Sequence, residues 1–135
     1  MVNFKFIGFW QEYTQNPNHP LFANINIGVD DANKSIFLHY LNNYCKFLFG
    51  YRRLGINLLN TQDEISAYSF YSDGVWVWSS ALIYYLDKHN IALPIEFTSH
   101  ILANIDDEQI VSEIMNKEFI NNIHSAVRYE MRFFT

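Results

Sequence analysis

The chain has little of what covalent or metal-based scaffolds are made from. Cys45 is the only cysteine among the 135 residues, so no disulfide can form within the chain and no cysteine-rich zinc site is present. The neighbours of Cys45 in residues 44–48 (Tyr-Cys-Lys-Phe-Leu) are mostly apolar. The sequence therefore predicts a buried and unreactive thiol at this position.

Motifs of the common enzyme classes are missing as well. The five glycines are scattered, which excludes a glycine-rich phosphate loop, and the chain contains neither His-Glu-x-x-His nor Gly-x-Ser-x-Gly. The five histidines never stand four residues apart, so histidines distant in the chain are the remaining source of a metal or catalytic site. We expect no metal, no cofactor and no enzymatic activity, and we interpret His89 and His100 as structural residues.

Positive charge and long apolar runs are also scarce. Nine Lys and Arg stand against 14 Asp and Glu, which gives a net charge of -5, and Arg52-Arg53 is the only basic pair. This balance argues against nucleic acid and against an anionic membrane surface, and it fits either a basic partner or ordinary solubility. No run of 18 apolar residues exists, and residues 1–8 lack the features of a signal peptide. We therefore expect a cytoplasmic protein with no membrane span.

Aromatic side chains are what the sequence has in excess. The chain contains 12 Phe, 9 Tyr and 3 Trp, and it is 50% hydrophobic and 17% charged. This composition is typical of a folded protein, and the length predicts one globular domain over residues 1–135. The rings outnumber what one small core needs, so we expect some of them at the surface, where aromatic side chains often take part in binding.

The periodicity of apolar residues predicts an α+β fold, in which a small antiparallel sheet (an N-terminal strand plus a central hairpin) packs with about four helices. Alternation predicts a strand over residues 2–9, and helical spacing predicts a helix over 32–43 after a turn-rich connection. Residues 44–53 fit either a helix or a strand. Further helices are expected from Ser79-Ser80 to about Asn90, from Pro94 to Asn104, and from about Asp106 onward.

The hairpin is predicted around Asp73-Gly74, between a strand over residues 65–70 and the alternating arm Val75-Trp76-Val77-Trp78. Asp-Gly is typical of a type I′ turn, whose two central residues both have positive φ. The two indoles share one face of their strand. Either they pack under the following helix, or at least one is exposed and forms a recognition platform together with Tyr71.

Acidic residues gather at the start of the last predicted helix. They are Asp106, Asp107, Glu108, Glu113 and Glu118, balanced only by Lys117. One interpretation is helix capping followed by a solvated face. The other is a docking surface for a basic protein, because opposite charges speed encounter and fix orientation.

One stretch resembles a known group of proteins. The pattern Asp73-Gly74-x-Trp76-x-Trp78, followed by Leu82, Tyr85, His89, Leu93-Pro94 and Phe97, is similar to one found in small bacterial immunity proteins of polymorphic toxin and contact-dependent growth inhibition systems. The match covers residues 71–101. A proline often follows the second tryptophan in that pattern, whereas this chain has Ser79, so its entry into the helix is expected to differ.

The resemblance implies an immunity protein that binds a cognate toxin domain and occludes its active or substrate-binding surface, with no chemistry of its own. Many such toxins are nucleases with basic surfaces, which suits an acidic inhibitor. The partner would be the C-terminal domain of the toxin, and the inhibitor itself would be a monomer. The expected contact residues are Asp106, Asp107, Glu108, Glu113, Trp76, Trp78 and Tyr71.

Two alternatives belong to other classes of protein. The first is a small enzyme or ligand-binding domain whose pocket is lined by Trp76, Trp78, Tyr71 and Tyr85, with a polar group such as Asp73 or His89 at its rim. A closed apolar cavity with converging polar groups would favour it, whereas a flat surface with exposed acids would favour the inhibitor. The second alternative is a structural module that assembles with itself.

Overall fold

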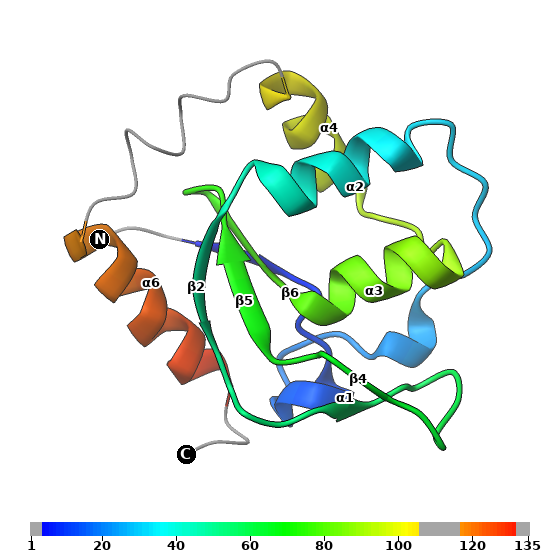
Figure 1. Ribbon diagram of the computed structural model, residues 1–135, viewed down its shortest axis with the longest axis horizontal. Helices are drawn as coiled ribbons and strands as arrows, with labels where there is room; N and C mark the ends of the chain where they lie inside the picture. Colours follow the sequence, from blue (N-terminus) through cyan, green and yellow to red (C-terminus); the bar gives the residue numbers. More distant parts are fainter. Residues whose placement is uncertain (1–3, 106–116, 132–135) are drawn as a thin grey trace.

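A four-stranded sheet runs through the middle of the protein, with helix α6 (Lys117–Glu130) on one face and helices α2 (Lys34–Asn43), α3 (Ser80–His89) and α4 (Ile95–Asn104) on the other (Figure 1). The structure is a computed structural model and describes residues 4–105 and 117–131. Its α+β class confirms the fold class predicted from the sequence. Among the described residues, no helix combines the length and the apolar character needed to cross a bilayer.

The strands lie in the order β1-β6-β5-β2. Their bounds are Lys5–Ile7 for β1, Lys46–Gly50 for β2, Ser69–Ser72 for β5 and Trp76–Ser79 for β6. Strands β2, β5 and β6 pair antiparallel, but β1 pairs parallel with β6. The sheet is therefore mixed, and the prediction that its strands are all antiparallel was wrong for β1. Strand β1 pairs with a strand that lies far away in the chain, and the alternation of residues within β1 does not indicate the direction of that pairing.

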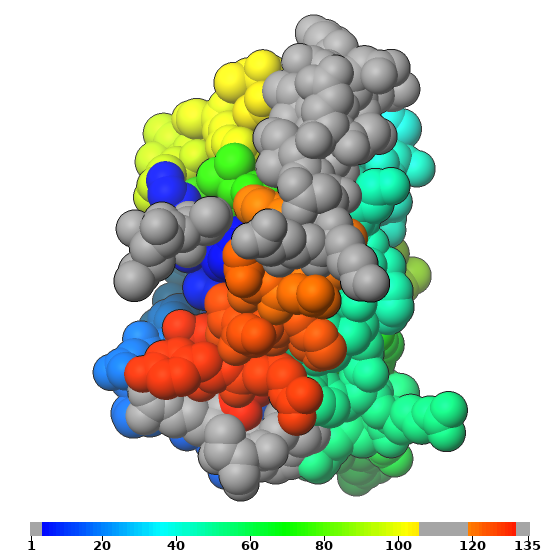
Figure 2. Space-filling model, turned by 90° about the vertical axis from the view of Figure 1, so that its left-hand side faces the viewer, coloured from blue at the N-terminus to red at the C-terminus, as the bar shows by residue number. Residues whose placement is uncertain are grey.

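Residues whose secondary structure was ambiguous from sequence form strand β2. A β-bulge between Phe47 and Phe49 shifts the register against β5, so two successive aromatic side chains point to opposite faces. Phe47 contacts Tyr71 on one face, whereas Phe49 contacts His124 of α6 on the other. Figure 2 shows α6, in orange and red, lying across this second face beside the region of β2.

Smaller elements surround the sheet. They are α1 (Gln11–Thr14), the 3-10 helix η1 (Phe22–Asn24) and a two-stranded sheet of β3 (Gly55–Ile56) with β4 (Glu64–Ile65). The helix predictions for residues 32–43, 79–90 and 94–104 are close to the observed α2, α3 and α4. The predicted start of the last helix lies outside the described residues. Within α6, Ile123 and Val127 are four residues apart, so they share one face of the helix, and both are fully buried.

The start of α3 is tied to the end of β1 by one serine. Ser79 Oγ accepts a hydrogen bond from Leu82 N (3.3 Å) and caps the helix, and the same hydroxyl donates to the carbonyl of Gly8 (2.8 Å). At the position where the immunity-protein pattern often has a proline, Ser79 therefore caps α3 with its own side chain. Gly8 has a φ of +77°, and a Cβ there would lie 2.7 Å from Leu82 Cβ and 2.9 Å from Ser79 Oγ. Only glycine adopts this positive φ without strain and also leaves room for the side chains of Leu82 and Ser79.

We expect Gly8→Ala to destabilise the protein much more than Gly28→Ala does. Gly28 has a similar φ of +71°, but a Cβ there meets nothing within 4 Å. Both variants pay about 1 kcal/mol for the left-handed backbone, whereas only Gly8→Ala adds an overpacking cost of about 1–3 kcal/mol. Urea denaturation measures the difference in the free energy of unfolding. Equal losses in the two variants would contradict the tight approach of β1 to α3.

Candidate functional site

The two tryptophans of the hairpin are core residues. Trp78 is 0% and Trp76 is 6% exposed. Their rings contact Phe97 of α4, with ring-centroid distances of 5.9 and 4.9 Å, and Trp78 also contacts Tyr40 of α2. The indole Nε1 of Trp78 is buried and has no hydrogen-bond partner. The packed alternative is therefore the observed one, although the covering helices are α2 and α4 rather than α3, and the two indoles do not form an exposed platform.

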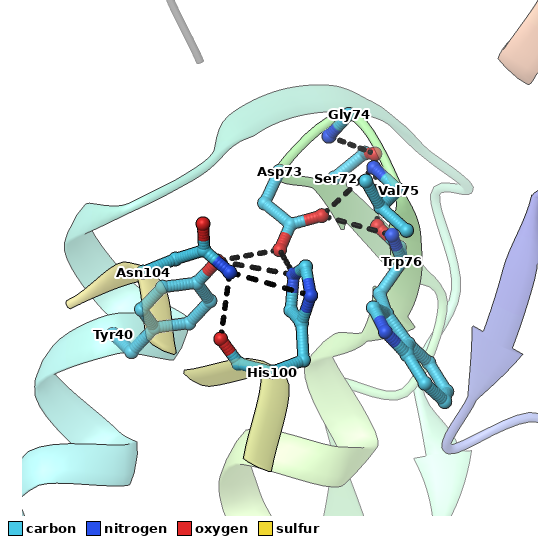
Figure 3. Close-up of polar contacts among 8 residues, drawn as sticks. All are labelled: Tyr40, Ser72, Asp73, Gly74, Val75, Trp76, His100 and Asn104. Carbon is cyan, nitrogen blue, oxygen red and sulfur yellow. Dashed lines mark hydrogen bonds and ion pairs between the residues drawn. The ribbon is translucent and has the colours of Figure 1, made fainter. Parts of the chain in front are cut away.

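The turn before Trp76 is organised by the carboxylate of Asp73 (Figure 3). Asp73 Oδ1 accepts hydrogen bonds from the backbone N–H groups of Val75 (2.9 Å) and Trp76 (2.8 Å). Gly74 has a φ of +102°, but Asp73 does not have a positive φ. The predicted type I′ turn was therefore wrong, because the aspartate side chain closes the turn by binding the backbone beyond it.

The other oxygen of Asp73 joins the hairpin to two helices. Asp73 Oδ2 accepts a hydrogen bond from the hydroxyl of Tyr40 in α2 (2.5 Å) and lies 2.7 Å from Nε2 of His100 in α4. The tautomer with a proton on Nε2 lets His100 donate to the carboxylate. Asn104 Nδ2 donates to the backbone carbonyl of His100 (2.8 Å). We call Tyr40, Asp73 and His100 the aspartate cluster.

Burial and the neighbouring carboxylate keep the hydroxyl of Tyr40 protonated. Desolvation is the largest cause, and the negative charge of Asp73 is the next, so the pKa of the Tyr40 hydroxyl is raised far above its usual value. The phenol stays protonated and donates. The carboxylate of Asp73 is buried and has four donors around it, which leaves it satisfied by the protein itself. The cluster is thus suited to clamp α2, the hairpin and α4 together, and the contact of His100 with Asp73 fits the structural role expected of it.

A second polar cluster links the N-terminal part of the chain to α6. His19 Nδ1 lies 2.7 Å from Thr14 Oγ1, and His19 Nε2 lies 2.8 Å from Glu130 Oε2. Asn16 Nδ2 adds a hydrogen bond to the carbonyl of Glu130 (3.1 Å). The order hydroxyl, imidazole, carboxylate is that of a nucleophilic triad. Thr14 is only 1% exposed, however, so the hydroxyl is poorly placed for a nucleophile and the geometry supports a structural link.

Tyr71 lies half-buried on the inner strand β5, beside an aromatic residue of the outer strand β2 that the sequence did not indicate. Phe47 of β2 is opposite Tyr71 in the ladder, and their rings meet edge to face with centroids 5.6 Å apart. Phe47 is 60% exposed, an unusual position for a phenylalanine. Because residues 44–53 fit either a helix or a strand, the sequence did not indicate that the side chain of Phe47 would be exposed. The four acidic residues of the expected interface, Asp106, Asp107, Glu108 and Glu113, lie outside the described residues.

A pocket of about 500 Å³ opens beside β1. Its walls are mainly apolar and come from the end of β1, the connection after α1, and the loop between α3 and α4. The lining residues are Phe6, Ile7, Gly8, Phe9, Trp10, His19, Pro20, Ile25, Asn26, Trp76, Leu82, Ile91, Ala92, Leu93, Pro94 and Glu96.

The pocket differs from the one predicted as the alternative site. Only Trp76 among the four expected lining residues contributes to it. Trp78 and Tyr85 are fully buried in the core, and Tyr71 belongs to another part of the sheet. Within the described part of the chain, no three His, Cys, Asp or Glu side chains stand close enough to hold a metal ion.

We expect Asp73→Ala to cost about 3 kcal/mol or more of stability, because it leaves several buried donors without an acceptor. Asp73→Asn should cost less, since its carbonyl oxygen still accepts from the turn. Asp87→Asn is the matched control on an exposed carboxylate of α3 and should stay within about 0.5 kcal/mol of the unmodified protein. Urea denaturation gives these differences, and a mild Asp73→Ala variant would show that the aspartate cluster is not a clamp.

We expect the thiol of Cys45 to be slow to alkylate. Burial, followed by the negative charge of Asp73, raises the pKa of Cys45 to about 11. At pH 8 iodoacetamide should react about tenfold more slowly than with the same chain unfolded in guanidinium chloride, because the loss of thiolate outweighs its higher nucleophilicity. The unfolded thiol also releases its proton first as pH rises from about 9 to 11, so stability should fall across that window. Equal rates in the folded and unfolded chain would contradict this environment.

In comparisons with known proteins, no protein-family model, no curated protein and no solved structure matches this chain.

Proposed function

We propose that the protein is an immunity protein, which binds a cognate toxin domain and blocks that domain's active or substrate-binding surface without chemistry of its own. The observation that carries the proposal is the aromatic edge formed by exposed Phe47 and its half-buried neighbour Tyr71. Exposed large aromatic side chains at the rim of a sheet are typical anchors of protein interfaces. The acidic net charge of -5 supports a basic partner.

The residues that carry the resemblance to immunity proteins are not those of the proposed interface. Trp76, Trp78, Leu82, Tyr85 and Phe97 are all buried, and they form the contacts between the hairpin and its helices. The pattern over residues 71–101 is thus a signature of the fold. A surface that distinguishes one toxin from another must use residues outside this signature, and Phe47 is such a residue.

The position of the edge suits contact with a second protein. Strand β2 is the outer strand of the sheet, and among the described residues no further strand pairs with its outer side. Strand β2 and the hairpin meet at Lys46 and Ser72, next to Asp73 and the aspartate cluster that holds α4. The predicted acidic contact residues follow α4 in the chain. In the proposed complex the aromatic anchor would supply affinity, and acidic residues would supply steering.

The proposal is tested by co-expressing the protein with the toxin C-terminal domain encoded next to its gene. We expect a stable complex that co-purifies, and growth of cells that the toxin domain alone would kill. If the two proteins form no complex and growth is not restored, the proposed function is wrong. Inhibition of the purified toxin domain at a one-to-one ratio then distinguishes occlusion from any catalytic effect.

Variants locate the interface within that complex. Phe47→Ala should weaken binding by about tenfold or more, mainly through faster dissociation, because a buried aromatic anchor is lost. Leu54→Ala is the matched control at another exposed apolar residue, and we expect it to have no effect. Surface plasmon resonance gives both rates. A Phe47→Ala variant that binds as the unmodified protein does would exclude the aromatic edge.

The acidic residues are tested by reversing the charges of Asp107, Glu108 and Glu113. The association rate should fall and lose its dependence on salt, while dissociation changes little. Reversal at the exposed acids Asp30, Asp31 and Asp87 gives the same change in net charge and serves as the control. Equal effects of the two triple variants would show that net charge, rather than one acidic surface, guides the encounter.

A further inference from the structure

The pocket beside β1 is built before any ligand arrives. Backbone hydrogen bonds hold its walls together: Ala92 N donates to the carbonyl of Asn26 (2.9 Å), and Gln11 N donates to that of Pro20 (3.0 Å). Pro20 and Pro94, which both line the pocket, restrict the backbone there. Such a pocket needs little ordering on binding, and ordering is one of the main costs of association.

The size and walls of the pocket suit a small molecule with rings. A volume of about 500 Å³ lies within the range of known small-molecule sites, about 300–1,000 Å³. Phe9, Trp10 and Trp76 contribute to its lining, although each is almost fully buried, so a ligand would meet only the small part of each ring that reaches the pocket. A flat ligand ring can meet such ring edges in an edge-to-face arrangement.

The ionisable side chains of the lining are already engaged. Both ring nitrogens of His19 have partners, Thr14 on one side and Glu130 on the other. Glu96 is bound to Lys5 by an ion pair of 2.6 Å, and the ammonium group of Lys5 also lies 5.5 Å from the centre of the Trp76 ring. A charged ligand would lose its hydration and find no opposite charge free to replace it. The walls therefore select an uncharged occupant.

From these observations we propose that the pocket beside β1 is a binding site for an uncharged, largely apolar compound of one or two aromatic rings. The proposal concerns a different surface from the aromatic edge of Phe47 and Tyr71, and it does not depend on the proposed immunity function. The ligand would contact Trp76, Trp10 and the backbone of Gly8, which all line the pocket.

The tryptophans provide the measurement. The chain has three, and two of them, Trp10 and Trp76, line the pocket. We expect the neutral probe 4-bromobenzyl alcohol, whose bromine quenches indole fluorescence on contact, to quench in a saturable way with a dissociation constant on the order of 0.1–1 mM. The anionic analogue 4-bromobenzoate should bind at least about tenfold more weakly, because its charge has no free partner in the pocket.

A filled pocket is the matched test. Ala92 lines the pocket, so Ala92→Phe should remove saturable quenching, whereas Ala103→Phe, on an exposed position of α4, should keep it. Amide shifts of the unmodified protein, measured by NMR during the same titration, should centre on Gly8 and Ala92. This second measurement decides the question even if Ala92→Phe does not fold. Quenching that does not saturate, that is unchanged in a folded Ala92→Phe variant, or that comes with shifts elsewhere would overturn the proposal.

Discussion

The fold depends on one buried carboxylate. Asp73 sits at the tip of the central hairpin, where water cannot solvate it, so its charge is tolerable only if the protein supplies donors. Two donors come from the turn itself, one from α2 and one from α4. These partners are distant in the chain. The requirement to satisfy a single carboxylate therefore fixes where both helices stand relative to the sheet, and with them the cover over Trp76 and Trp78.

The aromatic excess is explained mainly by packing on two faces of a thin sheet. One face presents Trp76 and Trp78 to α2 and α4, and the other presents Phe49 and Phe70 toward α6. Rings fill these layers because they bury a large area from few positions and meet edge to face. Phe47 is the exception: it pairs with Tyr71 on the face that carries Trp78, but on the outer strand β2, where it is 60% exposed. Its exposure costs hydrophobic stabilisation, which is the physical reason to look for a partner there.

The two proposals rest on different parts of this arrangement. The aromatic edge lies at β2, whereas the pocket lies beside β1, and these two strands form opposite edges of the sheet. A protein partner suits the first because the surface is open and aromatic. A small molecule suits the second because the walls are preformed and enclose a limited volume.

The sequence by itself determined the α+β class, the three helices between residues 32 and 104 and the hairpin, because these follow from local periodicity and capping. It indicated Asp73 as a turn residue, but its contacts with Tyr40 and His100 span 33 and 27 residues, and no local pattern records them. The parallel pairing of β1, the burial of both indoles, the exposure of Phe47 and the pocket were decided by the tertiary structure. Each of these depends on which elements pack together, and a side chain that alternates correctly along a strand does not reveal what will cover it.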